Sequence, residues 1–396
     1  MELKLDAAKW RKNRGIKRLL VALGADEGLT RYVGGAVRDD LLGLPVSDID
    51  LATKIPPDEV ISRLEKARIK AVPTGIDHGT ITAVSDGHPF EVTTLRRDVS
   101  TDGRRATVAF TDDWKEDAAR RDFTINALSA DPVTGELFDY FGGLDDLTLH
   151  HIRFIGDPLQ RIAEDHLRIL RFFRFHARFG IGEPDRSALE ACTLRANDLM
   201  ALSRERIADE LLKLLGMPDP SRTVQIMLER EILRPVLPEI ETTAQTRLVA
   251  LIAAEQQAGI DADPLRRLAA LLPQDESIAD DVGARLRLSN KARKRLISVA
   301  RPIDGVRPRA LAYRAGRECA VDRLLLDGRA AEAREIADWH SPRLPISGGA
   351  LIKKGLPEGP IVARTLRSIE DRWVGADFPT GAEFDRIVDE EMKRAA

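Results

Sequence analysis

Two aspartates separated by one residue, Asp48 and Asp50, are the first side chains in the sequence whose spacing suggests chemistry. On a strand, residues i and i+2 point to the same face, so two carboxylates at this spacing repel each other unless a cation holds them. Magnesium takes oxygen ligands from one or two carboxylates together with substrate phosphates, and paired ions clamp both oxygens of an in-line displacement. The pair therefore predicts a metal-dependent phosphoryl-transfer site. The alternative is an exposed acidic strand end.

Residues upstream of this pair suit a phosphate. Gly34 and Gly35 stand where we expect a strand to pass into a helix, and glycines there let backbone amides approach phosphate oxygens. Arg38, on the first turn of that helix, adds a positively charged fork for the same phosphates. The alternative interpretation is an ordinary tight turn.

A third carboxylate, Glu91, lies in the stretch PFEVTTL. Alternation along a strand places Glu91 on the face opposite Phe90 and Val92. Glu91 then either meets the two aspartates across the sheet or is an exposed strand glutamate, and the pattern alone favours neither.

The stretch GDPLQRIAEDHLRILRFFRFHARFG is the second region that suggests chemistry. Its charged residues recur at steps of three and four, with one longer gap, so we expect them to share one broad helix face. They are Arg161, Asp165, Arg168, Arg171, Arg174 and Arg178. A solvated helix with many ion pairs is the alternative, but the excess of arginine is hard to explain by ion pairing alone.

Asp165 and Arg168, expected one helical turn apart, offer an acceptor beside a donor fork. Cytosine and adenine each present an exocyclic amino donor beside an unprotonated ring nitrogen, whereas guanine and uracil present a carbonyl beside a ring N–H. An aspartate next to an arginine therefore matches C and A and leaves G and U with unpaired groups. The pair predicts that protein side chains read the base.

The surrounding sequence predicts an α+β head with a small mixed sheet, about 150 residues long, followed by an all-helical arm. We expect a helix over residues 5–23, a short helix within AVRDDLLG, and a strand that carries both Asp48 and Asp50. GTITAV and PFEVTTL read as two strands of a hairpin. The charged stretch 96–113 reads as a mobile loop that contains a strand.

Composition argues against a disordered chain, a disulfide-stabilised secreted protein and a membrane protein. A chain of 396 residues is long for one core, and its mixed charge, with a net value of −3, is typical of a folded globular protein. The two cysteines, Cys192 and Cys319, have no metal-ligand partner at short spacing and indicate a reducing compartment. Without a signal peptide or a membrane-spanning apolar run, we expect a cytoplasmic protein and no membrane partner.

Three motifs in order resemble the class II nucleotidyltransferases, the family of CCA-adding tRNA nucleotidyltransferases and bacterial poly(A) polymerases. They are GGAVRDDLLG (34–43), SDIDLAT (47–53) and RRDFTINALS (120–129). The resemblance implies a head like the palm of DNA polymerase β over residues 1–150. It also implies a helical neck over 151–215 with the base-recognition helix, a body over 216–300, and a tRNA-binding tail over 301–396.

The resemblance also implies roles for particular residues. Gly35 and Arg38 match the nucleotide-binding pair of the first motif, and Asp48 and Asp50 match its magnesium ligands. Four further positions match nucleotide contacts or base-reading residues of the family: Arg121, the EDxxR pair Asp165 and Arg168, and the arginines Arg171 and Arg174. Two Mg²⁺ ions, the substrates CTP and ATP, and the 3′ end and acceptor arm of tRNA are then the expected ligands. No protein partner is implied.

Three products remain open within the family: complete CCA on tRNA, part of CCA, or poly(A). PTGIDHGTITAV resembles the CCA-adding subgroup, and the stretch 96–113 has the length of the loop in enzymes that switch from C to A. Within that loop, Gly103 permits movement and Arg104 and Arg105 are candidates for contacting carboxylates of the pocket. A nucleotide-sensing or RNA-binding protein that has lost catalysis is disfavoured by the intact aspartates. A transferase acting on proteins or small molecules is disfavoured by the EDxxR helix.

Overall fold

The chain forms two compact units in a computed structural model that describes residue 5 and residues 9–102, 105–303 and 305–395. The first unit comprises Met1–Glu210 with Ile226–Val236, and the second comprises Leu211–Gln225 with Leu237–Ala396. The finer division into head, neck, body and tail stays a prediction.

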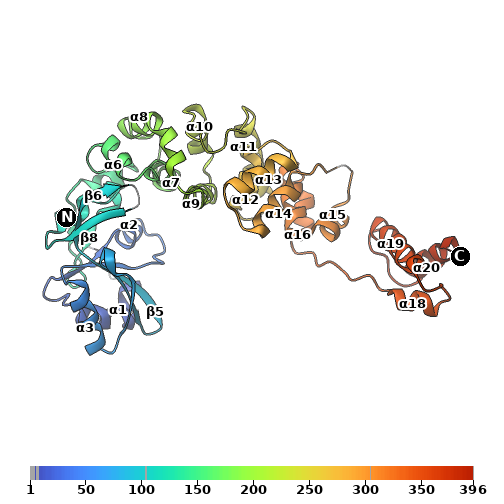
Figure 1. The fold of residues 1–396 in the computed structure, drawn as a ribbon, viewed down its shortest axis with the longest axis horizontal. Coiled ribbons are helices and arrows are strands. Elements are labelled where there is room, and N and C mark those ends of the chain that lie inside the picture. Colours follow the sequence, from blue (N-terminus) through green and yellow to red (C-terminus); the bar gives the residue numbers. More distant parts are fainter. Residues whose placement is uncertain (1–4, 6–8, 103–104, 304, 396) are drawn as a thin grey trace. The chain divides into compact units, whose positions relative to one another are not determined.

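A seven-stranded sheet forms the centre of the first unit (Figure 1), in the order β3-β4-β5-β2-β1-β8-β9. Only β2 and β5 run parallel, and the other neighbours are antiparallel, so the sheet is mixed, as the sequence predicts. Its strands are β1 Thr30–Val33, β2 Asp50–Thr53, β3 Lys70–Gly75, β4 Thr80–Ser85, β5 His88–Thr94, β8 Ser129–Ala130 and β9 Leu137–Phe138.

Alternating burial fixes the register of β5. Phe90 and Val92 are buried and Glu91 between them is exposed, so the predicted alternation is confirmed. β4 and β5 form the predicted antiparallel pair. The prediction that one strand carries both aspartates is wrong, because β2 begins at Asp50 and Asp48 lies in the irregular segment before it.

The predicted mobile loop at 96–113 is instead mostly a β-hairpin. β6 (Arg96–Asp102) pairs with β7 (Arg105–Phe110) in a separate two-stranded sheet. Valine and threonine in this stretch favour strands, and its charge content obscured that signal. Gly103 and Arg104 lie outside the described residues, and the proposed switching role of the loop stays a prediction.

Helices surround the sheet and continue the chain beyond it. α1 and α3 pack against each other and against β4. The expected helix over 5–23 is confirmed over Arg14–Ala22, where Asn13 caps its start, whereas Lys9–Lys12 form a short 3-10 turn. The α-helices of this unit before its boundary are α1 Arg14–Ala22, α2 Gly35–Leu41, α3 Pro57–Lys66, α4 Trp114–Ala119, α5 Gly143–Thr148, α6 Pro158–Glu164, α7 Arg168–Phe179 and α8 Arg186–Leu194. Short 3-10 helices occupy Ile76–His78, Thr124–Asn126 and Ala196–Ala201.

The described part of the second unit is helical and contains no strand. α9 (Arg204–Leu215) and α10 (Ser221–Glu229) each cross the division between the units. The remaining helices are α11 Ala244–Ala258, α12 Pro264–Leu271, α13 Glu276–Arg285, α14 Asn290–Val299, α15 Pro308–Ala315, α16 Arg317–Leu326, α17 Ala330–Ala337, α18 Gly348–Lys353, α19 Pro360–Gly375 and α20 Ala382–Ala395. None of the described helices is long and apolar enough to cross a membrane, and the cytoplasmic location stays a prediction.

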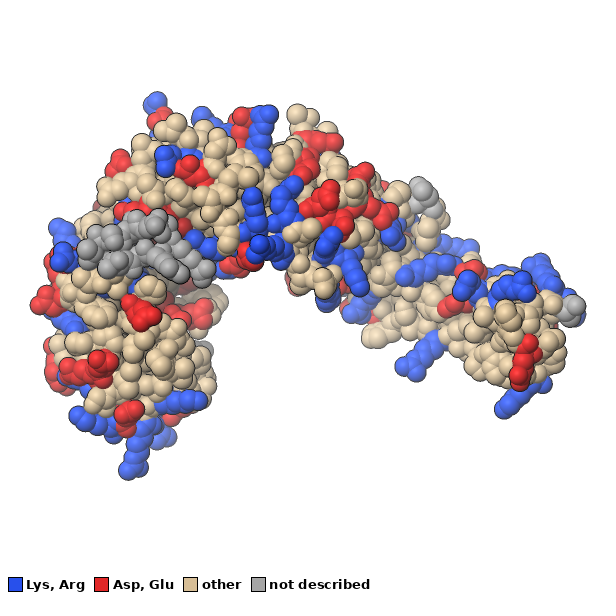
Figure 2. Space-filling view, in the orientation of Figure 1, with Lys and Arg blue, Asp and Glu red and all other residues tan. Residues whose placement is uncertain are grey.

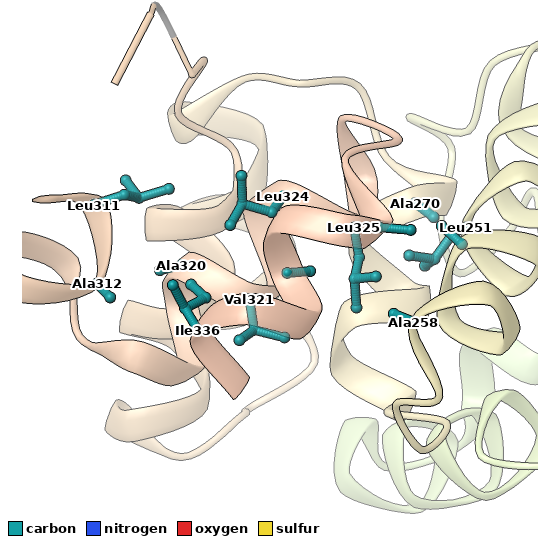
Figure 3. Close-up of a cluster of buried hydrophobic side chains, with 13 residues drawn as sticks. Leu251, Ala258, Ala270, Leu311, Ala312, Ala320, Val321, Leu324, Leu325 and Ile336 are labelled. Atoms are coloured by element: carbon teal, nitrogen blue, oxygen red, sulfur yellow. The ribbon is translucent and has the colours of Figure 1, made fainter. Parts of the chain in front are cut away.

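Two apolar clusters form cores of the second unit. In the first, side chains from α11, α15, α16 and α17 interdigitate, with Leu324 and Leu325 near the centre (Figure 3). The second joins α18, α19 and α20 around the buried Trp373.

A buried group of charged side chains ties α11, α12 and α16 together beside the first cluster. The Glu255 carboxylate accepts hydrogen bonds from Arg266 (2.7 Å) and Arg267 (2.9 Å), and Arg266 also donates to Asp322 (2.8 Å). All four side chains are at most 6% exposed, so each charge depends on its partners for stabilisation.

We expect Glu255→Gln to lower the free energy of unfolding by about 3–5 kcal/mol, because two buried guanidinium groups lose their shared anion. The matched control is Asp371→Asn, which breaks the pair that Arg314 and Asp371 form at 2.8 Å with both side chains 56% exposed, and should cost less than about 1 kcal/mol. Urea unfolding followed by circular dichroism compares the two variants. Equal losses would contradict a special role for the buried carboxylate.

Candidate active site

One cleft in the first unit brings together most of the residues that the sequence singles out. Its volume is about 400 Å³, within the range of small-ligand sites. Eight predicted residues line it: Gly34, Gly35, Arg38, Asp50, Arg121, Asp165, Arg168 and Arg171. Asp48, Glu91 and Arg174 are not among its lining residues.

The acidic end of the cleft is the start of β2. Asp50 lies beside Glu91 in the parallel β2–β5 register, so the sheet brings these two carboxylates together. Burial, and then the charge of Glu91, raises the pKa of Asp50, while Arg121 acts in the opposite direction and Asp48 adds a smaller upward effect. Asp48 is exposed and accepts a hydrogen bond from Ser47. The three carboxylates therefore repel one another.

The turn between β1 and α2 accommodates only glycine at position 34. Gly34 precedes α2 with φ of 66°, and a Cβ there would lie 2.9 Å from Nη1 of Arg121. Its amide donates to the carbonyl of Leu128, which ties the turn to the segment before β8. The predicted strand-to-helix junction is present, and it lets the backbone of Gly34 and Gly35 form one wall of the cleft.

The Arg38 guanidinium is buried and held from two sides. It donates to Asn126 Oδ1 and to Asp39 Oδ1, and its Cζ lies 4.4 Å from the centre of the Phe179 ring. The sequence predicts a fixed positive fork at this position, and its role toward phosphates stays a prediction. The buried guanidinium needs protein acceptors, and these fix its orientation in the lining of the cleft.

Asp122 links the head to α7. Its Oδ1 accepts from Asn126 Nδ2 at 3.0 Å and its Oδ2 accepts from Arg171 Nε at 2.7 Å. Burial alone would raise the pKa of this carboxyl, but the charge of Arg171 and the hydrogen bonds from Asn126, Arg171 and the Phe123 amide together lower it. An ionised Asp122 thus connects Arg38, through Asn126, to Arg171.

The expected continuous helix is interrupted at Asp165. α6 ends at Glu164 and α7 begins at Arg168, while Asp165 adopts an extended conformation with φ of −152°. Asp165 and Arg168 are therefore not on successive turns of one helix, and the prediction that all the charged residues share one helix face is wrong. The break is stabilised by Asp165 itself, which accepts from the Leu167 amide at 3.1 Å.

Both residues of this pair nevertheless line the cleft, each held by a different partner. Asp165 Oδ2 accepts from Arg206 Nη2 of α9 at 2.7 Å. Arg168 donates to the carboxylate of Glu164 and, at 2.8 Å, to the carbonyl of Arg161.

Two more arginines that the sequence predicts at the nucleotide site also contact protein groups. Arg174 donates to Glu210 Oε2 at 2.6 Å, which directs it to α9 instead of into the cleft. Arg121 lies 3.4 Å from Asp117 and 3.4 Å from the Asn126 carbonyl, and burial is the main cause of its lowered pKa.

Several residues of the site do not emerge from sequence reasoning. Asp122 and Asn126 stand inside RRDFTINALS, a motif in which the resemblance singles out Arg121 alone, and Phe175 of α7 also lines the cleft. Arg206 and Glu210 come from α9, and no local pattern in the sequence connects them with residues some 40 positions earlier. The motif offered a signal for the first two, whereas the α9 residues required the fold.

The positions of the acidic side chains give only limited support for a metal site. Among the residues that the structure describes, no three His, Cys, Asp or Glu side chains form a metal-binding group. Asp50 lines the cleft with the Gly34–Gly35 turn, and Glu91 and Asp48 act on it electrostatically from beside it.

Comparison with known proteins gives consistent matches. The family described as Poly A polymerase head domain matches residues 30–153, and the family described as Probable RNA and SrmB- binding site of polymerase A matches residues 183–243. The chain is 35% identical over 384 residues to the CCA tRNA nucleotidyltransferase 1, mitochondrial, of Mus musculus, covering 91% of this chain and 86% of that protein. It is 33% identical over 375 residues to the CCA-adding enzyme of Lacticaseibacillus paracasei, covering 88% of each. The fold resembles the Bacillus stearothermophilus CCA-adding enzyme in complex with CTP, with a TM-score of 0.69 at 24% identity over 96% of this chain and 99% of that one.

The raised pKa of Asp50 makes this residue a source of instability. An acid whose pKa is higher in the folded than in the unfolded protein destabilises the fold above that pKa, and the penalty disappears as the pH falls through it. We expect Asp50→Asn to stabilise the protein at neutral pH without divalent cations by about 0.5–2 kcal/mol, and this gain should shrink in mildly acidic buffer. Calorimetric melting at several pH values measures it.

The matched control for this prediction is Asp58→Asn, since Asp58 is an exposed aspartate of the same unit and should give no gain at any pH. A lower melting temperature for Asp50→Asn, or a gain that persists unchanged into acid, would contradict the argument.

Proposed function

Because the chain belongs to the family of CCA-adding tRNA nucleotidyltransferases, we propose that it adds the 3′-terminal CCA to tRNA from CTP and ATP and releases pyrophosphate. The observation that carries this proposal is the single cleft in which the carboxylate of Asp50 and the Gly34–Gly35 turn face Asp165, Arg168 and Arg171. The phosphate chemistry and the reading of the base would then share one pocket. The bacterial poly(A) polymerase reaction, the alternative within the sequence family, predicts incorporation of A alone.

We propose that Asp48 and Asp50 hold magnesium, with two ions expected, and that Glu91 supports them. The donor set fits this ion, since carboxylate oxygens are its preferred protein ligands and these carboxylates repel one another in its absence. When bound, magnesium would favour ionisation of the RNA 3′-hydroxyl and neutralise charge on the triphosphate.

The neighbouring residues of the chain would position the triphosphate. Gly34 and Gly35 allow backbone to approach the phosphates, and the guanidinium groups of Arg38 and Arg121 lie in the same wall. Because Asn126 and Asp39 orient Arg38, its remaining N–H groups present a fixed direction to the substrate.

Base selection rests on two residues that the protein holds separately. Asp165 would accept from the exocyclic amino group of C or A, and Arg168 would donate to the adjacent ring nitrogen. Arg206 fixes the carboxylate and Glu164 fixes the guanidinium, so the pair does not relax to accommodate G or U. An unpaired polar group against the wrong base would then be the main source of rejection.

The tRNA partner requires positive charge, although the whole chain has a net charge of −3. Figure 2 shows Lys and Arg side chains over the helices of the second unit, interspersed with acidic ones. α14 contributes Lys291, Arg293, Lys294 and Arg295, of which both lysines are exposed. We propose that local groups of this kind, rather than overall charge, contact the tRNA backbone, while the acceptor end enters the cleft.

We expect Asp50→Ala to abolish CTP and ATP incorporation into tRNA that lacks its 3′ end, because the cation loses a ligand in the cleft. tRNA binding should persist, since Asp50 lies at the polar rim of β2 and not in the core. Gel analysis after supplying each nucleotide in turn separates CCA addition from incorporation of A alone. Asp58→Ala is the control, and near-normal incorporation by Asp50→Ala would refute the assignment.

We expect Arg168→Ala to reduce both C and A incorporation by about 5- to 150-fold, the equivalent of about 1–3 kcal/mol for one unpaired polar partner, and to weaken rejection of U and G. Arg186→Ala is the control, because the Arg186 side chain on the next helix is 91% exposed, pairs with Glu190 and does not line the cleft. Steady-state incorporation of all four nucleotides measures the effect. Unchanged selectivity would mean that other residues read the base edge.

A further inference from the structure

A second cavity, separate from the active-site cleft, lies within the helical second unit. It is bordered by α11, α12, α13, α14 and α16 and offers about 640 Å³ of space, part of it open to solvent. Its floor is apolar, formed in part by Leu272, Leu296 and Val299, each at most 5% exposed. Ala270 belongs both to this floor and to the core cluster drawn in Figure 3.

Three arginines line this apolar cavity together with one aspartate, Asp327. Arg247 is fixed by donating to the Ala270 carbonyl at 2.9 Å and to Thr243 at 2.7 Å. Arg301 donates from Nε to Glu276 at 2.8 Å, and the Arg301 side chain remains 57% exposed. The lining therefore presents three guanidinium groups over apolar surface, of which Arg247 also pairs with Glu241 at 3.1 Å and Arg301 with Glu276.

Arg323 is the least satisfied of these arginines. One of its terminal nitrogens donates to the Pro302 carbonyl, but its Nε is shielded from solvent and has no hydrogen-bond partner among the described residues. Burial, and then the charge of Arg301, lowers the pKa of Arg323, so the two guanidinium groups are close enough to repel each other. Buried donors without acceptors are rare in proteins and costly, and an anion beside Arg323 would satisfy both its donor and its charge.

We propose that this cavity binds a small organic anion, whose apolar ring or chain lies against Leu296 and Val299 and whose negative head lies between Arg301 and Arg323. A phosphodiester of RNA offers the same negative charge. The apolar floor favours the small molecule, because an RNA backbone has no apolar portion to bury there. The site would be a regulatory or stabilising one, since it shares no residue with the active-site cleft.

Two matched fluorescent probes test this site on the full-length protein. Anilinonaphthalene sulfonate carries an apolar ring system with one negative charge, and N-phenylnaphthylamine has the same rings without the charge. We expect the sulfonate to bind with one-to-one stoichiometry and at least about tenfold more tightly than the neutral probe, in keeping with a charged hydrogen bond. Equal affinities for the two probes would overturn the proposal.

Two variants locate the probe by independent routes. Arg323→Met keeps an apolar side chain but removes the charge, and should reduce sulfonate affinity about tenfold or more while leaving the neutral probe unaffected. Ala300→Phe places a ring from the end of α14 into the cavity and should reduce the binding of both probes. Arg186→Met, at a side chain that is 91% exposed, is the matched control and should change neither.

Folding and the RNA alternative are checked in the same preparations. Melting curves identify any variant that fails to fold. The proposal would be refuted if every cavity variant that folds, whether both or only one, binds the sulfonate with unchanged affinity. Should neither fold, the comparison of the two probes on the unaltered chain decides. Addition of tRNA distinguishes the two sources of charge: retained sulfonate fluorescence supports a small-molecule site, and stoichiometric displacement by tRNA would overturn it in favour of RNA.

Discussion

The buried carboxylate of Asp122 is the constraint on which the geometry of the active-site cleft depends. It accepts from Asn126, which also holds Arg38 on α2, and from Arg171 on α7. α2 and α7 are far apart in the sequence, and this chain of hydrogen bonds fixes Arg38 relative to Arg171 across the cleft. A buried charge is tolerable only when its partners are in place, so removal of one partner would weaken the remaining contacts as well.

Asp50 and Asp122 show opposite responses to burial within the same cleft. Burial raises the pKa of Asp50, and Glu91 raises it further. For Asp122, Arg171 and three hydrogen bonds outweigh the effect of burial and lower the pKa. When two environments push the pKa values of two carboxyls in opposite directions, the two carboxyls take different roles. Asp122 is compensated by Arg171 and its hydrogen bonds, whereas Asp50 is the carboxyl that we propose binds a cation.

Local rules predict the parts of this site that depend on neighbouring residues. Strand alternation places Glu91 on the face opposite Phe90 and Val92, and the Gly34–Gly35 pair marks the turn, because a period of two and the freedom of glycine are local properties. That Glu91 lies beside Asp50 follows from the pairing of β2 with β5, which the local pattern left open. The same rules fail at Asp165, where three- and four-residue spacing predicts a continuous helix. The break depends on the aspartate's hydrogen bond to the Leu167 amide and on Arg206, supplied by a helix about 40 residues later. Periodicity carries no information about such a distant partner.

Acidic partners hold the arginines that line the cleft. Arg38, Arg121, Arg168 and Arg171 line it, and each contacts a protein carboxylate. Unpaired arginines would form a diffuse positive surface that attracts any polyanion. An arginine held by a carboxylate has less net charge to offer but keeps N–H groups in a fixed direction. If this cleft reads the base as we propose, fixed N–H directions serve it better than added charge, because the bases it must distinguish carry identical triphosphates.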